Sequence, residues 1–367
     1  MNPRSTLGTS VNTDAATDTH RRDSTAASGT AVPPRGRCEE ATLDTESPPG
    51  EATRPRPSVW LVGQRSPATQ RRGRFVAGSG AHPARMWPDL AAQAIDDYTQ
   101  PGDIILDPLA GIGTTLVEAI HAGRNPIGVE LEPGWAALAQ ANIAHAQAQG
   151  GTGHGRVICG DATHLPDLLP AELRGQVALV LTSPPYGRTT HGRVEHRRGP
   201  LTRFDNAYGE PDDANLAHRG RRDLLAGFTD VLAGCVPLLK PDGIVVVTAR
   251  PWRRDHFLID LPGQVIVAGI NAGLQPMERC VALLAAVRGD RLVPRHSFFQ
   301  LAVLRKSRAR GIPVHLIAHE DILVFQRSGK SPSSGEPKCS QREPESRPGR
   351  SSSVEMQPDG ESAGCAS

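Results

Sequence analysis

Residues 107–115, Asp-Pro-Leu-Ala-Gly-Ile-Gly-Thr-Thr, form a glycine-containing turn between a short apolar run and an amphipathic segment. The run Ile104–Leu106 follows the turn signal at 101–103, so we predict a short buried strand there. Residues 116–120 have helical spacing, and Gly123 is a stop signal. A strand, a glycine turn and a helix in this order are typical of an open α/β sheet, in which the turn lets backbone approach a ligand closely.

Three further predicted strands end in polar residues. The first ends in Glu130, about 20 residues after the glycine turn, where an acid can accept from both hydroxyls of a ribose. The second ends in Asp161 and Ala162, and the third runs into Ser183-Pro184-Pro185-Tyr186. Because a ligand of an open sheet binds at the carboxyl ends of the strands, these segments are candidates for one site.

Together, these motifs resemble those of the amino-group DNA methyltransferases, which methylate cytosine N4 or adenine N6 using S-adenosylmethionine. The resemblance is carried by Asp-Pro-Leu-Ala-Gly-Ile-Gly-Thr-Thr, Gly-Val-Glu, Gly-Asp-Ala and Ser-Pro-Pro-Tyr, and the similarity spans residues 82–327. Two positions depart from the commoner glycine motif: Leu109 stands where an aromatic residue is usual, and Ile112 where a serine is usual. These departures bear on cofactor affinity and not on the type of reaction.

The resemblance implies an α/β, Rossmann-like fold of the S-adenosylmethionine-dependent methyltransferase type. Its sheet would have seven strands, mostly parallel, with helices on both faces and a reversed last strand; the residues alone support only a mixed sheet. Residues 59–62 are either a small strand or a docking segment. Beyond the four strands above, we expect strands at 244–248, 277–284, 298–304 and 319–325. Helices are expected from Pro88 through Ile95 and over 224–239.

The resemblance also implies a set of cofactor-binding residues. Glu130 would accept from the ribose hydroxyls, Asp161 from the adenine amino group, and Asp107 would hold the loop and the methionine ammonium. Each acid by itself is also compatible with a helix cap or a turn. The family often has a His-Pro-x-x-x-x-Pro lead-in, here residues 82–88, whose loop closes over the methionine part. The full set is Asp107, Pro108, Ala110, Gly111, Gly113, Thr114, Glu130, Asp161 and Ala162.

Ser183, Pro184, Pro185 and Tyr186 are the candidate catalytic residues. An exocyclic base amine is a poor nucleophile because its lone pair is delocalised into the ring. The Ser183 oxygen and the Pro184 carbonyl are acceptors that can orient the amino group toward a sulfonium methyl. Consecutive prolines stiffen the loop, and Tyr186 offers a flat face for a base taken out of the stack. The expected reaction is direct transfer without a covalent enzyme intermediate or a metal.

Serine at position 183 favours cytosine N4 over adenine N6, because the adenine enzymes of the family mostly carry Asp or Asn there. The motif order, with the catalytic segment after the glycine turn, is unlike many cytosine N4 enzymes. Together with Gly187, it also resembles tRNA guanine-N2 methyltransferases. A non-catalytic nucleic-acid-binding protein that retains the cofactor fold is the third alternative.

Composition divides the chain into three parts. Residues 1–57 and 328–367 are rich in Ser, Thr, Pro, Gly and Arg, so we expect disordered tails around a methyltransferase domain at 58–327. Residues 187–222 lack apolar periodicity and are expected to form a long functional or disordered loop. Two arginine clusters, at 65–85 and 188–203, are either solvated loops or phosphate contacts. The candidate nucleic-acid-binding residues are Arg188, Arg193, Arg197 and Arg198.

The remaining predictions concern environment and partners. The six cysteines are scattered without a Cys-x-x-Cys pair, and we expect Cys159 and Cys235 to be core residues. No apolar run approaches the ~18 residues needed to span a bilayer. A reduced cytoplasmic protein without structural metal is expected. Its expected partner is DNA, with RNA as the alternative, and its oligomeric state is left open.

Overall fold

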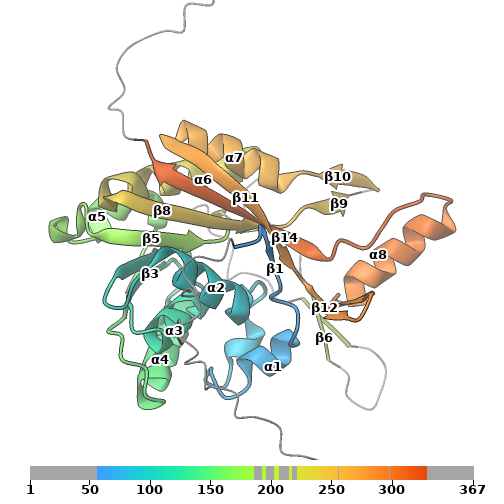
Figure 1. The fold of residues 1–367 in the computed structure, drawn as a ribbon, viewed down its shortest axis with the longest axis horizontal. Helices are drawn as coiled ribbons and strands as arrows, with labels where there is room; N and C mark the ends of the chain where they lie inside the picture. The colour runs from blue at the N-terminus through green and yellow to red at the C-terminus, as the bar shows by residue number, and fades with distance from the viewer. Residues whose placement is uncertain are drawn as a thin grey trace, which may run out of the picture. The chain divides into compact units, whose positions relative to one another are not determined.

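The computed structural model describes residues 56–185, 192–195, 202–205, 215–216, 221–254, 256–296 and 298–328. They belong to one compact unit, Arg56–Ser367. An eight-stranded sheet of order β1-β11-β14-β8-β5-β2-β3-β4 forms its centre (Figure 1). Its strands are β1 (Val59–Trp60), β2 (Ile104–Asp107), β3 (Asn125–Glu130), β4 (Arg156–Cys159), β5 (Val177–Thr182), β8 (Leu239–Ala249), β11 (Leu274–Leu283) and β14 (His319–Arg327).

Strand directions follow the expected pattern. Strands β4, β3, β2, β5 and β8 are parallel to one another. Strand β14 is antiparallel to both of its neighbours, β8 and β11, so β11 runs in the same direction as the parallel strands. The Rossmann-like fold with a reversed last strand is therefore confirmed. The sheet has one strand more than the expected seven, because β1 pairs in parallel with Val281 and Ala282 of β11.

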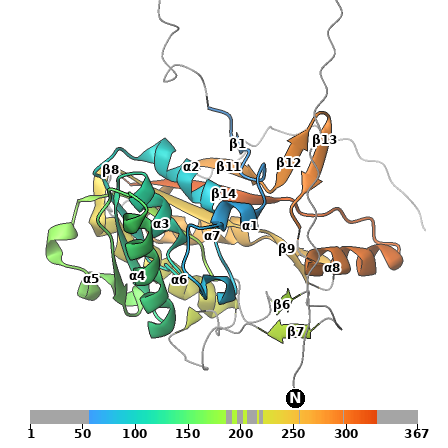
Figure 2. The same ribbon diagram turned by 90° about the horizontal axis from the view of Figure 1, so that it is seen from below.

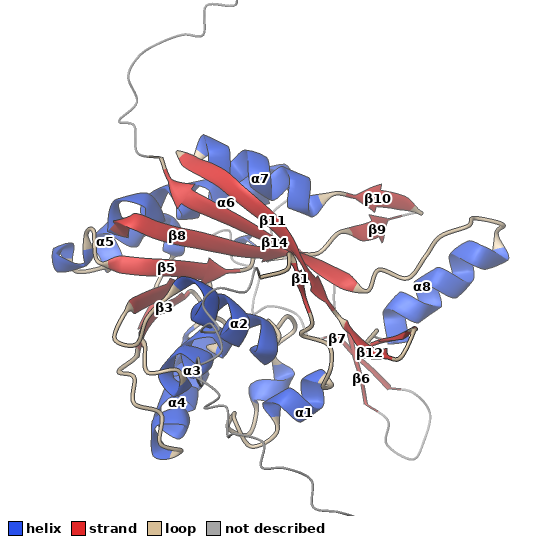
Figure 3. Ribbon diagram, in the orientation of Figure 1, coloured by secondary structure: helices blue, strands red, loops and turns tan. Residues whose placement is uncertain are grey.

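Helices cover both faces of the sheet, whereas α8 and three two-stranded hairpins lie outside it (Figure 3). The helices are α1 (Pro67–Arg71), α2 (Pro88–Tyr98), α3 (Thr114–His121), α4 (Pro133–Ala148), α5 (Leu165–Leu168), α6 (Arg221–Cys235), α7 (Leu261–Asn271) and α8 (Phe298–Ala309). The hairpins pair β6 (Gly192–Glu195) with β7 (Thr202–Asp205), β9 (Trp252–Arg254) with β10 (Phe257–Ile259), and β12 (Ala285–Arg288) with β13 (Arg291–Pro294). In the described part of the chain, no helix has both the length and the apolar character that crossing a membrane requires.

The central strands are buried on both faces, which is why their apolar runs are continuous. In β8, Val245 and Val247 pack in the cluster that contains Phe228 of α6 and Val265 of α7. Val246 points to the opposite face, where its cluster includes residues of α2. This alternation has the period of two that a strand imposes. Both layers of helices are therefore anchored by one strand.

One predicted strand is wrong. Residues 298–304 begin helix α8, which continues through Ala309. A short apolar run does not distinguish a strand from a helix, and the residues that follow, Arg305 to Ala309, include good helix formers. Val303 is 49% exposed, so this run does not fill a sheet interior.

Three smaller differences concern boundaries and burial. The helix expected over 224–239 ends at Cys235, and Leu239 already belongs to β8, because a 3₁₀ turn at Val236–Leu238 intervenes. The long loop expected at 187–222 contains the β6–β7 hairpin. Cys235 is buried as expected, whereas Cys159 is exposed because β4 is the edge strand of the sheet. Both expected tails lie outside the described residues, apart from 56, 57 and 328.

Gly269 of α7 provides a test of this packing. A Cβ at this position would lie 2.5 Å from Cε1 of Phe325, whose side chain is fully buried in β14. We expect Gly269→Ala to lower the free energy of unfolding by about 1–3 kcal/mol, because the ring must move in a close-packed core. Urea unfolding followed by circular dichroism measures the change.

Gly134→Ala is the matched control, because it also lies in a helix but has no atom within 4 Å of the added Cβ. Ala has the higher helix propensity, so this variant should be neutral or more stable by up to about 1 kcal/mol. Equal destabilisation of the two variants would contradict the packing of α7 on β14.

Candidate functional site

A pocket lies where the strand order reverses. From β2 the chain passes to β3 and β4 on one side, and it then returns to β5 on the other side of β2. The loops that follow β2 and β5 therefore diverge, and such a switch point is where open α/β sheets bind ligands. The pocket is lined by His82, 84–86, 107–112, Thr114, Thr115, 130–132, 160–162, 183–185, Asn215, Leu216 and Val231.

All but one of the described residues predicted for the cofactor and the reaction line this pocket. The exception is Gly113, which has a φ of +79° and is the N-cap of α3. Its Cβ position would be 3.2 Å from Cβ of Ala139, so it faces α4 and not the pocket. Gly113 thus serves the turn between β2 and α3, because glycine adopts positive φ without steric cost.

Glu130 connects two walls of the pocket. Its Oε2 accepts a hydrogen bond from the Gly111 backbone N–H at 2.8 Å, and its Oε1 accepts one from the Glu132 N–H at 2.9 Å. Burial nevertheless raises the pKa of Glu130 to about 7, because desolvation outweighs these bonds. Each carboxylate oxygen keeps a lone pair for a further donor.

Asp107 lies at the end of β2, and its side chain is almost fully buried. Its Oδ1 accepts from the Leu109 N–H at 3.2 Å, which closes the start of the glycine loop. Burial raises the pKa of Asp107 to about 6, and hydrogen bonds from Thr115 and Leu109 oppose that shift. Asp107 therefore contacts the start of the glycine loop.

Asp161 caps a helix, which the sequence allowed as an alternative to cofactor binding for each of the three acids. Its Oδ1 accepts from the Thr163 N–H at 2.9 Å, so it caps the 3₁₀ helix Ala162–His164. The same residue lines the pocket at the end of β4. A cap fixes the orientation of the carboxylate. Its other oxygen, Oδ2, lies 3.7 Å from Nδ1 of His164.

The lead-in segment folds over the glycine loop. The Nε2 atom of His82 lies 3.0 Å from the Cβ position of Gly111, so a side chain at position 111 would displace the ring. His82 also packs edge-to-face on Trp135 of α4, with ring centroids 4.9 Å apart. Its Nδ1 contacts the Ala84 carbonyl, and burial lowers its pKa to about 4, so the ring is neutral near pH 7.

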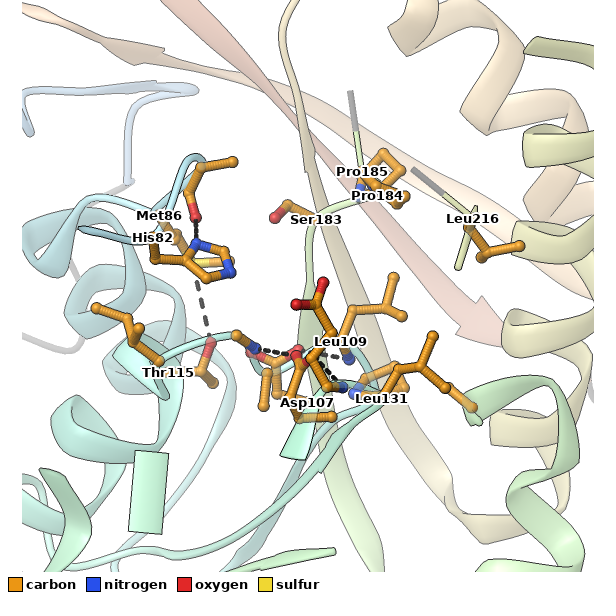
Figure 4. A pocket seen from close by; sticks show the side chains of 18 of the residues that line it. His82, Met86, Asp107, Leu109, Thr115, Leu131, Ser183, Pro184, Pro185 and Leu216 are labelled. Atoms are coloured by element: carbon orange, nitrogen blue, oxygen red, sulfur yellow. Dashed lines mark hydrogen bonds between the residues drawn. The ribbon is translucent and has the colours of Figure 1, made fainter. Parts of the chain in front are cut away.

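The segment Ser183–Pro185 follows the carboxyl end of β5 and lines the same pocket as the acids that follow β2, β3 and β4. Figure 4 shows Ser183 at the rim of the open space between His82 and Met86 on one side and Leu216 on the other. Tyr186, Arg188, Arg197 and Arg198 lie outside the described residues, and Arg193 belongs to β6, whose side chains the structure does not describe. The structure thus joins the serine and both prolines to the carboxylates.

Comparison with known proteins agrees with this arrangement. Residues 21–141 match a family model described as DNA methylase, and the match contains the glycine loop and Glu130. The match covers about a third of the chain, so it is a similarity of this segment to that family. The match begins within the part of the chain expected to be a tail.

Individual relatives share shorter stretches with this chain. The type II methyltransferase M.MthZI of Methanothermobacter thermautotrophicus is 44% identical over 15% of this chain and 16% of its own. M.XycI of Xanthomonas campestris pv. cyanopsidis is 34% identical over 24% and 26%. The alignments span less than a third of these relatives. Among solved structures, TrmN from Thermus thermophilus aligns with a TM-score of 0.41 and 18% identity, over 70% of this chain and 53% of that one.

Several pocket residues were not predicted from the sequence. Glu132 follows Glu130 by two positions, and its Oε1 accepts from Nδ2 of Asn215 at 3.0 Å. Asn215 and Leu216 come from the segment predicted as a long loop, where no periodicity marks them. Arg85, within the lead-in, is the one arginine or lysine among the pocket residues described.

The first arginine cluster is largely structural. Arg74 donates from Nε to Oε1 of buried Glu118 at 3.0 Å, and Arg65 pairs with Asp89 at 2.5 Å. Arg71 donates to the Met86 carbonyl and, at 3.4 Å, to the Thr114 hydroxyl. These contacts hold the lead-in against α3 and leave little of the cluster for phosphates.

The raised pKa of Glu130 predicts a dependence of stability on pH. The folded protein holds a proton up to about pH 7 that the unfolded chain releases near its ordinary value of 4.5. The stabilisation from this group is thus complete below that value and is lost as pH rises through about 7. Urea unfolding at several pH values should show a steeper loss for the wild type than for Glu130→Gln. Parallel pH profiles would contradict the burial of an ionisable carboxyl at this position.

Proposed function

We propose that this protein is an S-adenosylmethionine-dependent methyltransferase. It transfers a methyl group to an exocyclic amino group of a DNA base, with cytosine N4 favoured over adenine N6. The observation that carries the proposal is the convergence of Asp107, Glu130 and Asp161, from three strand ends, with Ser183 and Pro184 in one pocket. The match of residues 21–141 to the DNA methylase family supports it.

The charge of the pocket suits a cationic cofactor. Asp107, Glu130, Glu132 and Asp161 contribute four carboxyl groups, and Arg85 is the one arginine or lysine among the described lining residues. S-adenosylmethionine carries a sulfonium and an ammonium, which such a pocket attracts, and a carboxylate, for which Arg85 is a partner. Glu130 would accept from the ribose hydroxyls and Asp161 from the adenine amine. The residues present therefore fit the group.

The catalytic segment would orient the nucleophile. Ser183 Oγ and the Pro184 carbonyl accept the hydrogens of the base amine, which localises its lone pair. These two acceptors would aim the amine at the methyl group, and the proton that the amine gives up would pass to solvent or to a nearby acceptor. When bound, the cofactor supplies the electrophilic methyl. Serine at position 183 is the basis for favouring cytosine N4.

Substitution of Glu130 tests cofactor binding. Glu130→Ala should weaken S-adenosylmethionine binding at least tenfold, because charge-assisted hydrogen bonds of about 1.5–3 kcal/mol each are removed. Calorimetry measures the dissociation constant. Glu172→Ala removes an exposed acid that does not line the pocket and should leave affinity unchanged. Unchanged affinity in Glu130→Ala would remove this residue from the site.

Substitution of Ser183 tests the reaction. Ser183→Ala should lower turnover roughly a hundredfold while cofactor affinity is retained, because the serine acts on the amine and chiefly in the transition state. The assay follows transfer of a labelled methyl group to duplex DNA, with tRNA as a parallel substrate. Full activity in the variant would refute the assigned role.

Two outcomes would support the alternatives. Methylation of tRNA without methylation of DNA would identify a tRNA methyltransferase. Binding of S-adenosylmethionine without transfer to either nucleic acid would favour the non-catalytic protein.

A further inference from the structure

The segment between β11 and β14 lies at the end of the sheet where the parallel strands finish, which is also where the pocket lies. Strand β11 runs in the same direction as β5. Its carboxyl end therefore lies at the same end of the sheet as Ser183, which follows β5. Strand β14 starts at this same end of the sheet because it is antiparallel to β11 and β8. The β12–β13 hairpin and α8, which connect these two strands, therefore lie at the catalytic end of the sheet, as Figures 1 and 3 show.

This segment is strongly basic. Residues 285–319 contain seven arginines and lysines and one acid, Asp290, whereas the rest of the chain contains 34 basic and 38 acidic residues. Among the described residues, the one ion pair of these seven is between Arg291 and Asp290, at 3.9 Å, with both side chains more than 80% exposed. Arg305, Lys306, Arg308 and Arg310 are exposed. The positive charge is therefore available to an anionic partner.

The hairpin has the form of a ribbon with mixed side chains. Val287, Leu292 and Val293 are 36%, 56% and 43% exposed, and Arg288 and Arg291 lie beside them in the paired register. Figure 2 shows β12 and β13 extending beyond the end of the sheet. A two-stranded ribbon of this kind fits the major groove of B-form DNA, where arginines read guanine and apolar groups contact the thymine methyl.

The base of the ribbon is held firmly. A Cβ on Gly63 would lie 2.3 Å from the backbone nitrogen of Ala285, so the ribbon packs directly on this glycine. Arg295, which follows the ribbon, donates to the carbonyls of Gly63 and Gln64 at 3.3 and 3.1 Å. Arg288, beside the turn at the other end of the ribbon, donates to Oε1 of Gln64 at 2.9 Å, so the tip is also held against this segment. A fixed base gives the ribbon a defined direction, which recognition of a sequence requires.

We propose that the β12–β13 ribbon and α8 form the duplex-DNA-binding surface of this protein. The ribbon enters the major groove, and Arg305 and Lys306 contact the phosphates of the same duplex. This proposal rests on the proposed function and names the part of the chain that selects the target. The competing role for cations near the end of α8 is stabilisation of the helix dipole.

Salt dependence of binding tests the phosphate contacts. The variant is Arg305→Gln with Lys306→Gln, and the control is Arg156→Gln with Arg174→Gln, which removes equal charge from exposed residues at the opposite edge of the sheet. Fluorescence anisotropy with a labelled duplex gives the slope of log affinity against log salt. We expect the slope to fall by about 0.9 for each lost contact in the variant and to stay unchanged in the control.

The outcomes separate the two proposals. A wild type that methylates duplex DNA, together with a variant that keeps the wild-type salt slope, would overturn the surface and leave the methyltransferase intact. Equal losses in variant and control would overturn it as well, because a general charge effect would explain both. A wild type without transfer to DNA would overturn the proposed function, whatever the slopes. Thermal melting of both variants detects a role in α8 stability alone.

A second variant tests the ribbon. Arg291→Ala with Leu292→Ala removes one exposed cation and one exposed apolar side chain. Methylation-sensitive sequencing of DNA from expressing cells should show that preference for the wild-type target falls roughly tenfold or more, with cofactor affinity unchanged. An unaltered set of methylated sequences would show that the ribbon does not read the target.

Discussion

The carboxylate of Glu130 is the interaction on which the pocket depends. Its two oxygens bind the backbone of the loops that follow β2 and β3, through Gly111 and Glu132. The backbone of the same residue accepts from the Gly160 N–H at 2.9 Å, which adds the loop after β4. One residue thus fixes three walls of the site before any ligand enters. Removal of this carboxyl from water is the cost, and it appears as the raised pKa.

Most of the part of the sheet that forms the pocket could be predicted from the sequence. Strands β2, β3 and β5 are continuous apolar runs because both of their faces are covered, and each ends in residues whose chemistry is recognisable. Parallel strands bring their carboxyl ends to one edge, so the positions of Asp107, Glu130 and Ser183 follow once the strands are identified. The glycine turn marks the start of this arrangement. Local pattern and global fold agree here.

Three features could not be predicted, each for a physical reason. The run at 298–304 is short and apolar, and such a run has no period that distinguishes a strand from a helix. Ala302 and Val303 are exposed on helix α8. Asn215 reaches the pocket by a hydrogen bond to Glu132 across 83 positions in the chain, a contact that no local pattern encodes. Cys159 was misjudged because edge and central strands share a composition but not a burial. In each case, residues distant in the sequence determine the local structure, the contact or the burial.

The segment that carries the ribbon and α8 leaves and re-enters the sheet at almost one point. The Leu284 N–H donates to the Ala318 carbonyl at 2.8 Å, so the ends of the insertion are joined by a single hydrogen bond. Loop-closure entropy changes slowly with length, by about 0.6 kcal/mol for each doubling. An insertion with adjoining ends can therefore be exchanged for one of different length without rebuilding the sheet. In such an architecture, the segment between β11 and β14 can change in length and composition while the strand ends that form the pocket stay in place.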